Sequence, residues 1–241
     1  MGEEPPALAS GHAYPHPGGA TATPMNDQEL HRYYASRAPE YDRIYARPER
    51  QQDLRAIERW LPGRFSGRAT LEVACGTGYW TRFIAPLADE LLAVDASLEV
   101  LDIARSRVGA GTARFVRGDA YRLPLVPGAF DAAFAGFWFS HVPRARVRTF
   151  LAGLHQALAP GAVVVFLDNR FVGGSSTPIA ERDGEGNTYQ LRLLHGGSTH
   201  RVLKNFPSET ELREAVSGMA SDVGYREWEY FWALEYRVAG P

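Results

Sequence analysis

The sequence predicts an α/β fold in which a mostly parallel, seven-stranded sheet carries helices on both faces. Three observations lead to this prediction. Short apolar segments alternate with amphipathic helical segments along most of the chain. The apolar segments lack strict polar alternation, as is typical of strands that are covered on both faces. A glycine-rich turn, Gly76-Thr77-Gly78, stands where the first strand passes into the first helix of this alternation.

The composition indicates one folded domain that follows a tail. A chain of 241 residues, of which 45% are hydrophobic, can bury one full core. Residues 1–24 are rich in proline, glycine and alanine and cannot bury enough surface to offset the entropy of ordering. We therefore expect a disordered tail over 1–24 and a single domain over 25–241.

Charge and cysteine content narrow the classes of partner. The formal net charge of −2 gives no bulk attraction to a phosphate backbone, so we expect no nucleic-acid partner. No apolar run approaches the ~20 residues that cross a bilayer, so we expect no membrane partner. Cys75 is the only cysteine, which excludes a cysteine-based zinc site and fits a reducing compartment. We expect a cytoplasmic protein without a metal.

Helix signals mark the start of the domain. Asn26 and Glu29 form a capping-box pattern, and Pro39 ends the helix that follows. A second helix starts near Pro48 and carries an apolar stripe. We therefore expect cap helices over 26–61.

Strands and helices then alternate, and such alternation implies right-handed crossovers between parallel strands. The apolar runs predict strands over 69–74, 91–95, 113–117, 130–137 and 162–167, with helices over 79–88, 98–107 and 144–158. Ser208 and Glu211 form a second capping box, which starts a helix to about residue 220. The segments 225–230 and 232–238 predict an antiparallel pair at the sheet edge.

One segment does not belong to this alternation. The runs 188–194 and 199–206 flank His195-Gly196-Gly197-Ser198, which is a hairpin signal. The predicted hairpin insertion, at about 186–206, follows the fifth strand and lies at the rim where ligands enter open α/β sheets. We expect it to form part of a substrate site or of a homodimer contact.

The segment Glu72-Val73-Ala74-Cys75-Gly76-Thr77-Gly78 carries the strongest motif in the chain. Its glycines let the backbone turn tightly and leave helix N-terminal amides facing a ligand. Asp95 ends the second strand about twenty residues later, where a carboxylate can accept hydrogen bonds from two ribose hydroxyls. Together these features predict a site for a ligand that contains ribose.

From about residue 30 to its end, the chain resembles the class I S-adenosylmethionine (SAM)-dependent methyltransferases that act on small molecules. Gly118-Asp119-Ala120 matches their adenine-binding loop, and Ala135-Gly136-Phe137-Trp138 matches the fourth-strand end beside the methionine moiety. Ala74 departs from the pattern, since the family usually has its first glycine there. The resemblance implies a Rossmann-like methyltransferase fold, SAM as cofactor, and an enzyme that transfers methyl groups. It implies cofactor contacts from Glu72, Ala74, Gly76, Gly78, Asp95, Ala96, Asp119, Ala120, Gly136 and Phe137.

The N-terminal segment is similar to the cap helix of these enzymes. In the family, tyrosine hydroxyls and an arginine of this segment often close over the methionine carboxylate. Tyr33, Arg37, Tyr41 and Tyr45 stand at matching positions, and a guanidinium suits a carboxylate. A packing helix with aromatic anchors is the alternative.

Two alternatives to a methyltransferase stay open. NAD-dependent oxidoreductases use the same kind of fold, but a dinucleotide site needs a third glycine where this chain has Tyr79-Trp80-Thr81. The carboxylate of Glu72 would also repel a pyrophosphate. The second alternative is a SAM-binding regulatory or scaffold protein without catalysis.

The acceptor side is predicted from residues that follow the fourth and fifth strands. His141 lies in the loop where the family often builds its acceptor site, and histidine suits proton removal from a hydroxyl or ammonium group. A histidine that caps the following helix is the alternative. The acceptor is expected to be a small molecule that is methylated on oxygen or nitrogen, with carbon as a further option. Expected acceptor contacts are Trp138, Asp168, Arg170 and Tyr189.

Overall fold

The computed structural model describes residue 42 and residues 44–109, 111–123, 126–193 and 199–240. In this part of the chain, one seven-stranded sheet has the order β3 (Arg114–Arg117), β2 (Glu90–Asp95), β1 (Ala69–Val73), β4 (Phe130–Gly136), β5 (Leu158–Asn169), β10 (Phe231–Val238), β9 (Ala220–Glu227). The first five strands in this order are parallel. β10 pairs antiparallel with both β5 and β9. The predicted fold class and the antiparallel pair at one edge are therefore confirmed.

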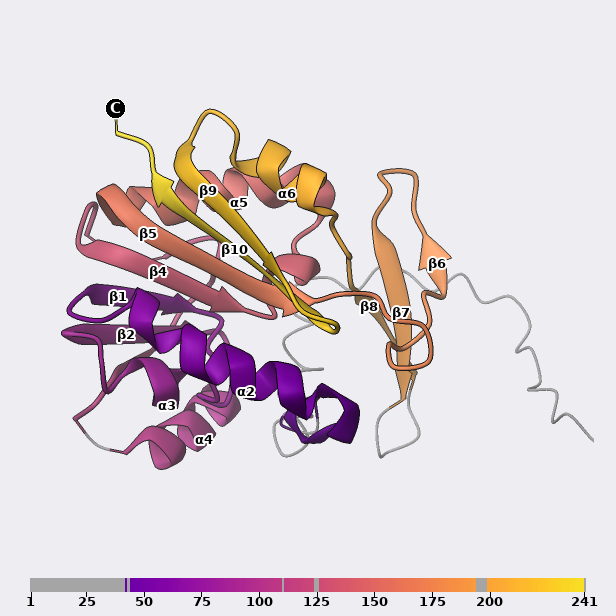
Figure 1. The fold of residues 1–241 in the computed structure, drawn as a ribbon, viewed down its shortest axis with the longest axis horizontal. Helices are drawn as coiled ribbons and strands as arrows, with labels where there is room; N and C mark the ends of the chain where they lie inside the picture. The colour runs from indigo at the N-terminus through magenta and orange to yellow at the C-terminus, as the bar shows by residue number, and fades with distance from the viewer. Residues whose placement is uncertain (1–41, 43, 110, 124–125, 194–198, 241) are drawn as a thin grey trace, which may run out of the picture.

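Helices cover both faces of this sheet (Figure 1). One face carries α2 (Gln51–Trp60), α3 (Thr81–Ile84) and α4 (Leu98–Val108), and the other carries α5 (Val147–Gln156) and α6 (Glu209–Val216). Successive residues of a strand point to opposite faces. In β4, Ala133 and Ala135 accordingly pack on the α5 side, whereas Ala132 and Phe134 pack on the α2 side. This double burial explains why the strands read as continuous apolar runs.

Two helices, α3 and α6, end about four residues earlier than the sequence predicts, and each has a local cause. α3 stops at Ile84, well before residue 88, because Pro86 cannot continue a helix and restricts the residue before it. α6 starts at the predicted capping box of Ser208 and Glu211 but ends at Val216. Gly218 then adopts a φ of +78°, and the chain enters β9 at Ala220. β9 consequently begins five residues before the predicted 225.

The predicted hairpin insertion is part of a separate three-stranded antiparallel sheet. β7 (Thr188–Leu193) pairs with β8 (Thr199–Leu203), as the sequence predicts, and β6 (Glu181–Arg182) adds a short edge strand. This small sheet stands beyond the carboxyl ends of β4 and β5 (Figure 1). It therefore lies at the rim where open α/β sheets bind ligands.

The N-terminal predictions are met only in part by the described residues. The second cap helix is present as a 3₁₀ turn, Pro48–Arg50, followed by α2. The tail over 1–24 and the helix that starts at Asn26 lie outside the described ranges. Within those ranges, no helix has both the length and the apolar character that crossing a membrane requires.

Candidate active site

The glycine turn connects β1 to α3 in the geometry that the motif predicts. Gly76 and Gly78 have φ values of +54° and +74°, a region that favours glycine. A Cβ atom added to Gly78 would lie 3.0 Å from the Cβ of Ala104 on α4. This position therefore also requires a residue without a side chain. Ala74 has a φ of +55°. The family's usual first glycine would relieve this strain.

Asp95 joins the glycine turn to the end of β2. Its Oδ2 accepts a hydrogen bond from the Gly76 amide at 2.9 Å, and its Oδ1 accepts one from the Ser97 amide at 3.0 Å. The carboxylate is half-buried, as is Ala96 beside it. A carboxylate fixed at this point fits the predicted ribose contact.

Glu72 is the most deeply buried acid of the motif. Burial raises its pKa to about 8, and the neighbouring Asp95 adds to the shift. Its Oε2 has no hydrogen-bond partner among the described residues. A cationic group beside this oxygen would satisfy it and favour the ionised form. The site residues therefore fit SAM, which carries an ammonium group.

The loop after β3 holds the two further cofactor candidates. Asp119 is exposed, and its Oδ1 accepts a hydrogen bond from the Tyr121 amide at 2.8 Å, which shapes the turn. Ala120 is half-buried and packs against the core.

Phe137 follows β4 directly after Gly136 and carries backbone strain. Its φ is +58°, and its amide donates a hydrogen bond to Leu167 O at 2.7 Å. Its ring lies 5.7 Å from the rings of Tyr45 and Phe231, centroid to centroid. Such strain away from glycine is typical of functional positions.

A cavity of about 330 Å³ opens between Phe137 and the small sheet. Phe137, His141 and Asn169 contribute from the ends of β4 and β5, Arg50 from the turn before α2, and the segment 175–177 from the loop after β5. Gln190, Arg192 and Lys204 contribute from the small sheet. The volume is that of a small-molecule site.

His141 ends a 3₁₀ turn, Phe139–His141, and lines this cavity. Its Nδ1 lies 2.7 Å from Leu203 O. Because a carbonyl oxygen only accepts hydrogen bonds, Nδ1 carries the hydrogen, and Nε2 holds the lone pair of the neutral ring. Burial holds the pKa of His141 well below its usual value, and the charges of Lys204 and Arg192 act in the same direction. The ring is therefore neutral at physiological pH.

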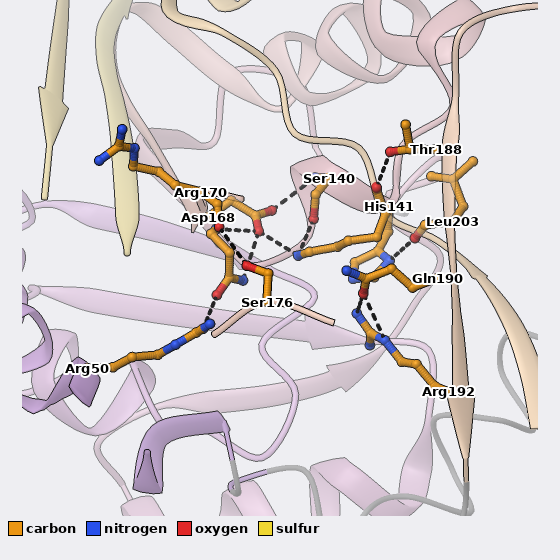
Figure 2. A network of polar contacts seen from close by, with 12 residues as sticks. Arg50, Ser140, His141, Asp168, Arg170, Ser176, Thr188, Gln190, Arg192 and Leu203 are labelled. Carbon is orange, nitrogen blue, oxygen red and sulfur yellow. Dashed lines mark hydrogen bonds and ion pairs between the residues drawn. The ribbon is translucent and has the colours of Figure 1, made fainter. Parts of the chain in front are cut away.

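A buried ion pair lies next to His141 (Figure 2). Lys204 Nζ lies 2.7 Å from Asp168 Oδ1 and donates to Ser140 Oγ at 2.6 Å. Asp168 Oδ2 also accepts from the Ser140 amide at 3.0 Å. Burial alone would raise the pKa of Asp168, but the ammonium of Lys204 holds it below its usual value. Burial lowers the pKa of Lys204 despite this partner.

None of the four predicted acceptor residues lines the cavity. Trp138 packs on Tyr121 and Phe150, with ring centroids 5.9 and 6.4 Å away. Tyr189 donates to Asp183 at 2.9 Å. Arg170 donates to Trp228 O at 2.8 Å and turns away from Ser140 (Figure 2).

These contacts favour structural roles, and acceptor binding by Trp138, Arg170 and Tyr189 stays a prediction without support. Asp168 contacts two residues that do line the cavity: Lys204 at 2.7 Å, and Asn169, whose backbone amide donates to it at 2.8 Å.

The lid candidates Tyr33, Arg37 and Tyr41 lie outside the described residues. Tyr45 is described, and its ring stacks on Tyr79 at 3.5 Å with an interplanar angle of 4°. This stacking is what a packing anchor shows.

Sequence reasoning missed the basic residues of the cavity, Arg47, Arg50, Arg192 and Lys204. Arg47 and Arg50 stand three positions apart, but Arg192 and Lys204 lie far along the chain, and only folding brings them to the same cavity.

Comparisons with known proteins point to methyltransferases. A family model for a methyltransferase domain matches residues 70–161. The malonyl-[acyl-carrier protein] O-methyltransferase of Serratia marcescens is 29% identical over 215 residues, which are 82% of this chain and 80% of that protein. The demethylmenaquinone methyltransferase of Staphylococcus aureus (strain JH9) is 29% identical over 150 residues, or 59% of this chain and 61% of that protein.

Solved structures extend the likeness over most of the chain. A DhpI–SAH complex is 31% identical with a TM-score of 0.71, over 87% of this chain and 95% of that one. A DhpI–SAM–HEP complex is 30% identical with a TM-score of 0.72, over 90% of this chain and 100% of that one. Two likenesses at 30% identity or more over most of the chain, and a family model that spans the glycine turn, show that the chain belongs to the class I SAM-dependent methyltransferases.

Proposed function

We propose that this methyltransferase transfers the methyl group to an oxygen or nitrogen atom of a small molecule that occupies the cavity beside His141. One observation carries the proposal: a single cavity is lined both by Phe137, at the strand end where the family places the methionine moiety, and by His141. One relative, which is named as an O-methyltransferase, supports a heteroatom as the acceptor.

When bound, SAM supplies an electrophilic methyl group, and the electron pair of the broken carbon–sulfur bond stays on the sulfur of S-adenosylhomocysteine. The protein's own task is to align the acceptor lone pair and to exclude water. Phe137 and Leu191 form an apolar part of the cavity wall. Asn169 and Gln190 contribute polar groups that can orient an acceptor.

His141 takes the proton that the acceptor loses. The lone pair on Nε2 can accept a hydrogen bond from an acceptor O–H or N–H group. A hydroxyl becomes strongly acidic as its oxygen gains the methyl group, so a ring of low pKa is basic enough at that stage. The carbonyl of Leu203 keeps the ring in the required tautomer.

The test is to incubate the protein with SAM and a set of small hydroxyl and amine compounds. The expected result is S-adenosylhomocysteine together with one product that has gained a CH₂ unit and carries the methyl on oxygen or nitrogen. A product methylated on carbon would contradict the heteroatom assignment. Stoichiometric SAM binding without turnover across the set would favour the non-catalytic alternative.

A further inference from the structure

We propose that the acceptor carries an oxyanion, either a carboxylate or a tetrahedral group such as phosphate, which binds between Arg50 and Arg192 in the cavity beside His141. This inference rests on the proposed function, because it names the class of substrate that the same cavity takes.

The charge of the cavity wall is the first observation. Four basic side chains line it, those of Arg47, Arg50, Arg192 and Lys204, and no carboxylate lines it within the described part of the chain. The whole protein has a formal net charge of −2, so this concentration of positive charge is local. A water-poor pocket of one sign attracts ligands of the opposite sign.

Two of these four charges are already compensated. Lys204 pairs with Asp168 at 2.7 Å, behind the cavity wall. Arg47 lies 3.7 Å from the exposed carboxylate of Glu49. These two cations therefore need no ligand.

Among the described residues, Arg50 and Arg192 donate hydrogen bonds only to neutral groups, and the carboxylates of Glu49 and Asp53 act on Arg50 without pairing directly with it. Arg50 donates to Asn169 Oδ1 at 2.9 Å and to Ser175 Oγ at 3.0 Å, although only 6% of the residue is exposed. The nearby Asp53 directs Oδ2 to the Tyr230 amide instead. Arg192 donates to Gln190 Oε1 at 2.9 Å. Guanidinium groups held in this way in a pocket, without a directly paired carboxylate, are suited to binding an anion.

The arrangement of these groups supports a shared ligand. Arg50 comes from the turn before α2 and Arg192 from β7, and Figure 2 shows them on opposite sides of Ser176. The loop segment 175–177 adds three hydroxyl side chains to the same wall. An oxyanion between the two guanidiniums would accept charge-assisted hydrogen bonds from both, since each is a rigid donor of paired N–H groups.

The carboxylate of SAM is a second source of the same chemistry, and an experiment separates the two. The protein is first saturated with S-adenosylhomocysteine, which brings its own carboxylate. Calorimetry then measures binding of acetate, of inorganic phosphate and of the neutral N-methylacetamide. We expect saturable binding of one or both anions, and none of the neutral amide.

Variants connect this binding to the two arginines. Arg192→Gln and Arg50→Gln should each weaken anion binding about tenfold or more, which is the loss of one charge-assisted interaction. Arg192→Lys and Arg50→Lys should recover part of it. Arg182→Gln, an exposed arginine on β6 that does not line the cavity, removes the same charge and should change nothing. Unchanged affinity for S-adenosylhomocysteine shows that each variant is folded.

Three results would overturn the inference. The first is that wild-type protein saturated with S-adenosylhomocysteine binds neither anion. The second is that Arg182→Gln weakens anion binding as much as Arg192→Gln does. The third is that, in the Arg50 and Arg192 variants, affinity for S-adenosylhomocysteine falls in parallel with anion binding, which would assign the arginines to the cofactor. The proposed function fails separately: anion binding with no methyl transfer contradicts it alone, and methylation of neutral acceptors without anion binding contradicts the inference alone.

Discussion

At the scale of single residues, the site combines backbone strain with unusual protonation. Ala74 and Phe137 both adopt φ values near +55° without being glycine, and both stand in segments that match the family's cofactor motifs. Glu72 is a buried acid with a raised pKa, and His141 is a buried base with a lowered one. Each of these features lowers the stability of the folded state, so its contribution can be measured as a change in the free energy of unfolding.

Ala74→Gly should raise the free energy of unfolding by on the order of 1 kcal/mol, because glycine adopts the left-handed conformation without steric cost. Urea unfolding measures the change. The control is Ala133→Gly in β4. There the glycine relieves no strain; it raises the conformational entropy of the unfolded chain and removes a packed methyl group. That variant should lose roughly 0.5–1 kcal/mol or more. A loss of stability in both variants would show that Ala74 is not strained.

Glu72→Gln should remove a pH dependence of stability. The pKa of Glu72 is about 8 in the folded protein and near its ordinary value when unfolded. The unfolded state therefore holds fewer protons, and stability falls as the pH rises toward about 8. Between about pH 6 and about pH 8 the wild type should lose on the order of 2 kcal/mol relative to Glu72→Gln. Parallel curves for the two proteins would contradict the buried, protonated state.

His141→Gln should lower turnover by ~10²–10⁴-fold, as expected for the loss of a positioned base, while affinity for S-adenosylhomocysteine stays the same. Because the pKa of His141 is lowered, wild-type turnover should show no loss from its protonation between about pH 7.5 and about pH 6. His155→Gln is the control, since His155 contacts Tyr236 at 2.7 Å, away from the cavity. A stability loss with normal turnover in His141→Gln would assign the histidine a structural role.

At the scale of elements, the small sheet is attached to the rim of the large one through buried polar contacts. Lys204, just after β8, reaches Asp168 near the end of β5, and the Asn205 amide donates to Ser140 O at 2.8 Å. The predicted contribution of this insertion to a homodimer stays a prediction. Its contacts instead place it as one wall of the cavity.

Lys204→Met should lower the free energy of unfolding by about 3–5 kcal/mol, because it leaves Asp168 charged and buried without its partner. Adding Asp168→Leu to this variant should recover part of the loss. The control is Arg213→Met, which breaks the exposed pair with Glu209 and should cost about 0.5 kcal/mol or less. Equal losses in Lys204→Met and Arg213→Met would show that the buried pair is not held as described.

The sequence predicted those parts of the site that are local in the chain. Gly76, Gly78 and Asp95 form a recognisable pattern because a turn and the next strand end supply all three. The cavity could not be predicted in this way, because its contacts join residues that are far apart in the sequence. Arg50 donates to Asn169 across 119 positions, and Lys204 donates to Asp168 across 36. β6 escaped prediction because a two-residue strand has no periodicity.

At the scale of the whole molecule, the glycine turn lies at the end of β1 in the large sheet, and the cavity lies between the large sheet and the small one. S-adenosylhomocysteine should raise the melting temperature, since a ligand of the native state adds about 2.7 kcal/mol at one hundred times its Kd. NAD at the same concentration should give no shift. Asp95→Ala should reduce the shift by weakening the ribose contact. A shift with NAD and none with S-adenosylhomocysteine would contradict the cofactor assignment.

The place of β10 bears on how the protein is synthesised. Although Phe231–Val238 is the last strand of the described chain, it lies inside the sheet, between β5 and β9. A nascent chain that has already paired its five parallel strands therefore exposes the backbone edge of β5 until these residues leave the ribosome. An open edge of apolar sequence is a template for association between chains. Ribosomes stalled before residue 231 should thus carry an aggregation-prone intermediate, and release of the next residues should end that exposure.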